Sequence, residues 1–207
     1  MITKVLPVAL LSVGLASHAN ADAYIFGNIG MSKFDVGSAP AGFSVDDQDV
    51  ATEIGIGYEL NDTLALEVGY ASLGETSVST VGTQSGTVYG STVSVNGKIA
   101  VDSKGFTFGV RGNAPLNDNL KMYGRLGLYN WTTDVSISGT TTINGTTYTG
   151  SASGEADDGT DFYFGAGAEY DLSDKFAITA GWTRFAPTVL SEDVNVDTFY
   201  LGGVLKF

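Results

Sequence analysis

The chain has 207 residues, with 10 Lys and Arg against 23 Asp and Glu, so its formal net charge is −13 at pH 7. This acidic surplus argues against nucleic-acid binding, which requires a basic surface. The sequence contains no Cys, which excludes disulfides and thiol redox chemistry.

The N-terminus, residues 1–21, has the features of a secretory signal peptide. Lys4 supplies the positive start, residues 5–15 form an apolar stretch, and Ala19-Asn20-Ala21 is a small-x-small cleavage site. We expect cleavage before Asp22, because the apolar stretch is too short for a membrane anchor. The only His, His18, lies in this segment, so the expected mature domain, residues 22–207, has no imidazole.

Eight segments of the mature chain show the period-two alternation of β-strands. In chain order they are residues 23–34, 51–60, 64–73, 105–114, 120–131, 161–170, 176–185 and 198–207. Each is near the 9–11 residues that a tilted membrane strand needs, and no later stretch is apolar for long enough to form a membrane helix.

The connections between these segments alternate in length. The short ones, around Asn61-Asp62 and at residues 115–119 and 171–175, carry the turn-forming residues Asn, Asp or Pro. The long ones are residues 33–50, 74–104, 132–160 and 186–197, and they are acidic and rich in Thr, Ser or Gly. Residues 76–103 also alternate, and we expect them to extend a hairpin above the membrane. Short turns on one side and long loops on the other are typical of outer-membrane barrels.

The two faces of each segment differ in character. In the sixth segment, Phe162, Phe164 and Ala166 alternate with Tyr163 and Gly165. Glycines interleaved with a few large polar side chains suit a narrow lumen, and an apolar face suits lipid. Aromatic residues at the turn-proximal ends of the apolar faces would form an interfacial girdle; they are Tyr58, Tyr70, Tyr170, Phe176, Trp182 and Phe207.

The sequence therefore predicts an all-β fold, an eight-stranded antiparallel up-and-down transmembrane β-barrel. The alternative left open is a soluble all-β domain, in which the apolar face and its aromatics would form an ordinary core.

Several short motifs, in order along the whole mature chain, resemble the membrane barrel of the outer-membrane protein A (OmpA) family. They include Tyr24-Ile25-Phe26-Gly27-Asn28, Leu66-Glu67-Val68-Gly69-Tyr70, Gly105-Phe106-Thr107-Phe108-Gly109-Val110-Arg111, Gly167-Ala168-Glu169-Tyr170 and Leu205-Lys206-Phe207. The resemblance implies a monomeric barrel whose lumen is plugged by charged side chains. The peptidoglycan-binding domain of the longer family members is not implied, because the chain stops at Phe207.

Four charged residues match inward positions of that family. Glu67 would be the central acid, Arg111 its basic partner on the next strand, Glu169 a second acid and Arg125 a second base. The family's further inward Arg corresponds here to Thr179, which puts the alternative pairing of its proposed gate in doubt. Strand parity independently puts all four charges on the lumen face, where unpaired charges would be costly. We expect these pairs mainly to fill and rigidify the interior.

The final strand carries two expectations. Counting back from Phe207, alternate residues through Phe199 face outward, whereas Tyr200, Gly202, Val204 and Lys206 face the lumen. In the family that this chain resembles, a terminal outward aromatic is a signal for the barrel-assembly machinery. We therefore expect Phe207 to be the assembly signal.

Enzyme chemistry and metal binding have little support in the sequence. Hydrolases of outer-membrane barrels usually need a Ser paired with His, and the mature chain has no His. Residues 157–161, Asp-Asp-Gly-Thr-Asp, lack the order of a calcium loop. We expect no catalytic site, cofactor or metal site. A separate hypothesis is that the acidic loops share divalent cations with lipopolysaccharide phosphates.

Three functions are consistent with these features. The first is a structural barrel in the outer membrane of a Gram-negative cell that presents surface loops, with lipid and lipopolysaccharide as neighbours. The second is a small channel gated by the lumen salt bridges. The third is an adhesion or immune-evasion barrel of the OmpX/Ail type.

Overall fold

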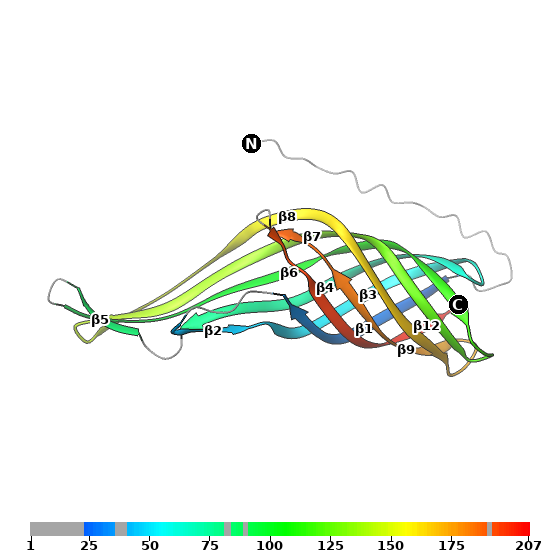
Figure 1. The fold of residues 1–207 in the computed structure, drawn as a ribbon, viewed down its shortest axis with the longest axis horizontal. Coiled ribbons are helices and arrows are strands. Elements are labelled where there is room, and N and C mark those ends of the chain that lie inside the picture. The colour runs from blue at the N-terminus through cyan, green and yellow to red at the C-terminus, as the bar shows by residue number, and fades with distance from the viewer. Residues whose placement is uncertain (1–22, 36–40, 81–83, 89–90, 190–191) are drawn as a thin grey trace.

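Figure 1 shows the computed structural model of the chain, which describes residues 23–35, 41–80, 84–88, 91–189 and 192–207. The expected signal peptide, residues 1–21, lies outside the described residues. No helix in these ranges is long and apolar enough to cross a membrane.

A closed ring of eight antiparallel strands forms the body of the molecule. The ring consists of β1 (Ala23–Phe34), β3 (Gln48–Asn61), β4 (Leu64–Thr80), β6 (Ser91–Pro115), β7 (Leu120–Ile143), β8 (Thr146–Asp171), β9 (Phe176–Phe185) and β12 (Val196–Lys206). Each pairs with the next, and β12 returns to β1, where Tyr24 lies opposite Lys206. The ring confirms the predicted fold class, and the predicted segments 23–34 and 176–185 match β1 and β9 to the residue.

Four further strands are short and lie outside the ring, beyond the same end of the barrel. β2 (Phe43–Asp46) pairs with β4, and β5 (Gln84–Val88) pairs with β6. β10 (Thr188–Val189) and β11 (Glu192–Asp193) pair only with each other. They all fall within connections that the sequence assigns to long loops.

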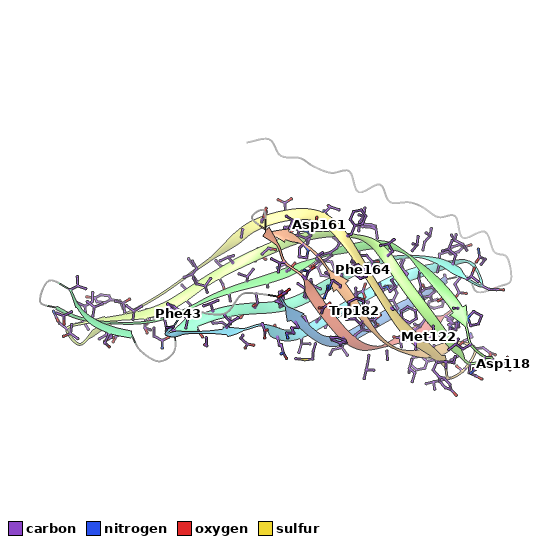
Figure 2. The ribbon with its side chains drawn as sticks, in the orientation of Figure 1. Phe43, Asp118, Met122, Asp161, Phe164 and Trp182 are labelled. Carbon is purple, nitrogen blue, oxygen red and sulfur yellow. The ribbon has the colours of Figure 1, made fainter. Side chains whose placement is uncertain are left out.

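The opposite end of the ring carries the short turns and the C-terminus (Figure 1), and Figure 2 labels Asp118 there. Local hydrogen bonds close each turn: Asn61 Oδ1 accepts from the Thr63 backbone N–H at 3.0 Å, and Asn117 Oδ1 accepts from that of Leu120 at 2.9 Å. Ser173 Oγ accepts from the Phe176 N–H at 3.1 Å. Short polar side chains that bond the backbone a few residues further on are what tight turns require.

A projecting sheet, which we call the arm, continues the ring at its other end (Figure 1). It is built from residues 43–46, 75–80, 84–88, 91–104, 132–143 and 146–160. The expected hairpin extension within residues 76–103 is confirmed, since Val78 pairs with Ile99. The expected loop at residues 132–160 is wrong: β7 and β8 pair without a break up to Ile143 and Thr146, apart from one bulge.

The tip of the β7–β8 hairpin explains that error. Asn144 and Gly145 have φ angles of 47° and 85°, the positive values of a two-residue type I′ turn. Ser and Thr composition indicated a loop, but Val135, Ile137 and Ile143 alternate with the hydroxyl residues as in a strand.

Outward side chains of all eight ring strands form an apolar belt around the barrel. Phe162, Leu201 and Ile54 are 68%, 67% and 64% exposed. Other exposed members include Ile29, Leu66, Phe108, Leu126, Phe164, Ile178 and Phe199. A continuous exposed apolar surface of this kind is unfavourable in water and favourable in lipid. The alternative of a soluble domain with its apolar face inside is therefore wrong.

The aromatic girdle differs from its prediction at two residues, Tyr70 and Trp182. Tyr70 lies away from the turns, where it pairs with Ile54 and Phe106. Tyr58, Tyr170 and Phe176 lie near the turns and are exposed, as expected. Trp182 lies toward the arm instead: it pairs with Phe199, and its indole N–H donates to Asp197 at 2.9 Å. Figure 2 shows Trp182 on the barrel wall beside Phe164, and their rings meet edge-on with centroids 5.6 Å apart.

Candidate functional site: the barrel interior

Glycines on the inner face make room for large side chains. A Cβ at Gly57 would lie 2.0 Å from the Tyr24 ring, and one at Gly167 would lie 2.5 Å from the Tyr123 ring. Neither contact is possible between real atoms, so each aromatic ring occupies the space above a glycine. The interleaving of small and large residues that the sequence indicated is the packing rule of this interior.

Arg125 on β7 stands at the centre of a buried ion network. Its guanidinium donates to Glu53 on β3 through two bonds of 2.9 and 2.7 Å and to Glu67 on β4 at 2.7 Å. Arg125 and Glu67 are 4% and 3% exposed. Glu53 also accepts from Asn28 at 3.0 Å and from Thr107 at 3.3 Å. Charge-assisted bonds in this number compensate for removing the three charges from water.

Arg111 on β6 bonds a different acid. Its Nη2 donates to Glu169 on β8 at 2.5 Å, and its Nη1 lies 3.7 Å from Glu67. The guanidinium also covers the Tyr123 ring, 3.9 Å from the centroid. Tyr24 donates to Glu67 at 2.8 Å. Glu67 therefore links the two arginines, and each arginine has a second acid of its own.

Two lysines extend the network toward the turns. Lys121 Nζ lies 3.3 Å from Glu169 and 3.6 Å from Asp171, and Lys206 Nζ donates to both acids, at 2.9 Å to Glu169. The network thus holds four acidic and four basic side chains, and their formal charges cancel; its members are Glu53, Glu67, Glu169, Asp171, Arg111, Arg125, Lys121 and Lys206.

The structure brings together all four charged residues that the sequence singled out. The expected ion pair of Glu67 and Arg111 is present at 3.7 Å, but both residues also make shorter contacts, Glu67 with Arg125 at 2.7 Å and Arg111 with Glu169 at 2.5 Å. Thr179 stands inside, as parity requires, and its hydroxyl donates to Asn28 at 3.5 Å. The resemblance therefore located the charges and one of their ion pairs, but not the shortest contacts, which form across the barrel.

Four members of the network were missed: Glu53, Lys121, Asp171 and Lys206. The signal was present, because Glu53 shares the parity of Gly55 and Gly57, and Lys121 that of Arg125. Lys206 was assigned to the lumen face but not to the cluster. Parity alone does not reveal that side chains from strands distant in sequence meet.

A buried apolar cluster closes the interior on the arm side of the network. The rings of Tyr129 and Phe185 meet edge-on at 4.9 Å, and Tyr163 stacks on Phe185 at 5.5 Å. The other members are Phe34, Ala71, Leu73, Trp131 and Val196. The Trp131 indole N–H donates to Asp161 at 2.9 Å. These buried rings fill the interior between the network and the arm.

Small hollows border the network. One of about 20 Å³ is lined by Glu53, Thr183, Thr198 and Tyr200 among others, and one of about 10 Å³ touches Glu67 and Arg125. Volumes of this size hold about one water molecule each. The interior of an eight-stranded barrel is just wide enough for side chains to fill, and here they do so.

The residues considered for a calcium loop form part of β8 instead. Asp157 and Asp158 lie within the arm, and Asp161 accepts from Trp131. Among the described residues, no group of three or more acidic, His or Cys side chains is arranged to hold a metal ion.

The closed ring, the apolar belt and the charged interior agree with the comparison to protein families. The model of the outer membrane protein β-barrel domain matches residues 5–207. The chain belongs to this family. It is an integral β-barrel protein of the outer membrane, and the exposed belt is its lipid-facing surface.

Solved structures of other outer-membrane barrels are similar to the chain at low sequence identity. Neisserial surface protein A is 15% identical, with a TM-score of 0.52 over 90% of this chain and 98% of that chain. OprG from Pseudomonas aeruginosa is 14% identical, with a TM-score of 0.52 over 90% and 96%. Ail, the attachment invasion locus protein of Yersinia pestis, is 18% identical, with a TM-score of 0.45 over 90% and 99%. No curated protein sequence matches the chain.

Proposed function

We propose that this protein is a structural barrel that presents its arm outside the cell and does not conduct solutes. It is exported by the signal peptide at residues 1–21, is monomeric within its membrane, carries no cofactor and is not an enzyme. A single observation carries this proposal: the interior is filled by a charge-balanced ion network and sealed by buried aromatic rings.

The network supports a close relation to OmpA-type barrels. Glu67, Arg111, Arg125 and Glu169 meet at the centre of the interior, where the resemblance expects a plug. Thr179 lacks the charge of the family's further Arg, so a switch of partners through that position has no counterpart here. We therefore assign the cluster a structural role rather than a gating role.

The partners that we propose follow from the outer surface. Lipid and lipopolysaccharide chains cover the apolar belt, and acidic arm residues such as Glu155 share divalent cations with lipopolysaccharide phosphates. The barrel-assembly machinery recognises the end of β12: Phe207 is 56% exposed, and its backbone N–H donates to the Ala23 carbonyl at 3.1 Å. Nucleic acid is not a partner.

Protease shaving of intact cells tests the presentation of the arm. We expect added protease to cut the arm and leave a protected barrel fragment that migrates faster on a gel before heating than after. An arm cut only after the outer membrane has been opened would show the reverse orientation and overturn the proposal. Loss of the arm in a deletion variant should leave the barrel folded.

A further inference from the structure

The outer part of β8 has an open edge. β8 pairs with β7 along its whole length but with β9 only from Tyr163 to Asp171. Among the described residues, no strand pairs with residues 146–154 on the side away from β7. Figure 1 shows β8 continuing into the arm past the end of β9. The backbone groups on that side are therefore available to another strand.

The composition of this edge lacks the usual protection against pairing. Residues 146–154 are exposed and contain neither a charged residue nor Pro. Natural edge strands are normally kept apart by charges, Pro or shortness. The other border of the arm is formed by β2 and β5, which are protected by being only four and five residues long. Acidic residues on β8 begin only after the open segment, with Glu155, Asp157 and Asp158 the first three.

We propose that this edge pairs with the same edge of a second copy of the chain. An antiparallel pair centred on Gly150 would place Thr149 of one copy opposite Ser151 of the other and Tyr148 opposite Ala152. A large side chain then meets a small one, and hydroxyl meets hydroxyl, the kind of cross-strand pair that stabilises a sheet.

The position of the charges permits a second copy as the occupant in one register. The chain is strongly acidic, so most contacts between two copies would be repulsive. In the pairing centred on Gly150, the paired segments are uncharged, and Glu155 of one copy falls beside the Gly145 turn of the other rather than beside an acid. The acidic residues thus permit this register and disfavour one shifted toward the barrel.

The inner face of the arm adds an apolar contribution. Tyr148 is 60% exposed and Ile137 is 52% exposed, and Ile137 pairs with Ala152 in the register of β7 and β8. Across the proposed interface, the Tyr148 ring of one copy covers Ala152 of the other and approaches its Ile137. Burying part of both side chains favours association.

The direction of the strands determines which copies meet. Arms of two copies in one membrane project the same way, so their β8 strands run parallel. An antiparallel pair of identical edges, related by a twofold axis, instead needs arms that project toward each other. The partner copy therefore lies in a facing membrane, and the protein remains monomeric within its own. This inference rests on the proposed display of the arm outside the cell.

Clustering of vesicles tests the pairing. The full chain is folded into lipid vesicles, and protease is added to a sample of each preparation. The untreated remainder is used only if protease cuts the arm in that sample. We expect turbidity to rise with the protein density, because many weak pairs act together. Vesicles with the arm exposed that stay dispersed at every density would overturn the pairing, whereas an arm that protease cannot reach on intact cells would count against the proposed display.

Charge substitutions test the register. Thr149→Lys places Lys residues of both copies near each other and should slow clustering by about tenfold. Ser151→Glu should do the same, and mixing the two preparations should restore clustering, because Lys and Glu then lie opposite each other. Thr140→Lys is the matched control: Thr140 pairs with Thr149 but lies on β7, one strand away from the edge. The pairing would be overturned if Thr140→Lys slowed clustering as much as Thr149→Lys, or if mixing the Lys and Glu variants did not restore clustering.

Discussion

Arg125 and Glu53 meet across the barrel interior through two hydrogen bonds, at 2.9 and 2.7 Å, although 72 residues separate them in the chain. Glu67 bonds the remaining Nε of the same guanidinium at 2.7 Å. This shared cation ties β3, β4 and β7 together from the inside. It makes the buried ion network a determinant of barrel stability as well as a plug.

Replacing Glu53 by Gln should destabilise the barrel strongly. The change leaves Arg125 with a single carboxylate in a buried site, and breaking a buried ion pair typically costs about 3–5 kcal/mol. The free energy of unfolding in urea, measured on vesicle-bound protein by Trp fluorescence, checks this value. Glu59→Gln is the control: Glu59 lies on the same strand, is half-buried and forms no ion pair with the described residues. If Glu59→Gln lowered the free energy of unfolding as much as Glu53→Gln, a specific role for Glu53 would be contradicted.

Gly57→Ala should also destabilise the barrel, through packing. The new Cβ would lie 2.0 Å from the Tyr24 ring, which has little freedom to move because the Tyr24 hydroxyl donates to Glu67. Forcing extra volume into a packed interior costs about 1–3 kcal/mol. Gly27→Ala provides the comparison, because the nearest atom to its Cβ is 4.0 Å away. Equal unfolding free energies for the two variants would show that the interior can accept an added Cβ at Gly57.

Gly145→Ala should loosen the tip of the arm and leave the barrel intact. Gly145 has a φ of 85°, and a side chain in the left-handed region costs about 1–2 kcal/mol. We expect faster amide hydrogen exchange around the β7–β8 turn and an unchanged barrel melting temperature. Gly154→Ala, in the same hairpin and with nothing within 4 Å of its Cβ, should leave exchange at the tip unchanged. Slow exchange at the tip of Gly145→Ala would argue against the type I′ turn.

Deleting Phe207 should lower the yield of barrel assembled in cells. Phe199→Ala removes an outward aromatic from the same strand, 62% exposed, without changing the chain end. The fraction of heat-modifiable protein in isolated outer membranes measures assembly in each case. If both variants assemble equally well, Phe207 contributes apolar surface rather than a recognition signal.

The alternation of residue types along each strand predicted the barrel well, because lipid and lumen require opposite chemistry from alternate residues. It assigned Glu67, Arg111, Arg125 and Glu169 to the interior, where all are less than 5% exposed. It could not pair them, since Arg125 meets Glu53 only once the sheet has closed. The β7–β8 part of the arm escaped prediction for a different reason. Above the membrane no lipid enforces an apolar face, so residues 132–160 alternate between Ser or Thr and a few Ile and Val and resemble a loop in composition.

Conductance in planar lipid bilayers tests the central claim most directly. If the ion network and the aromatic seal close the interior, the folded protein should leave the bilayer current at its baseline, although protease shows it to be inserted. Glu67→Ala, which leaves Arg111 and Arg125 each with one acid, should create a measurable current only if the network is the barrier. A steady current from the unaltered chain that changes with Glu67→Ala would contradict the closed barrel and establish a channel instead.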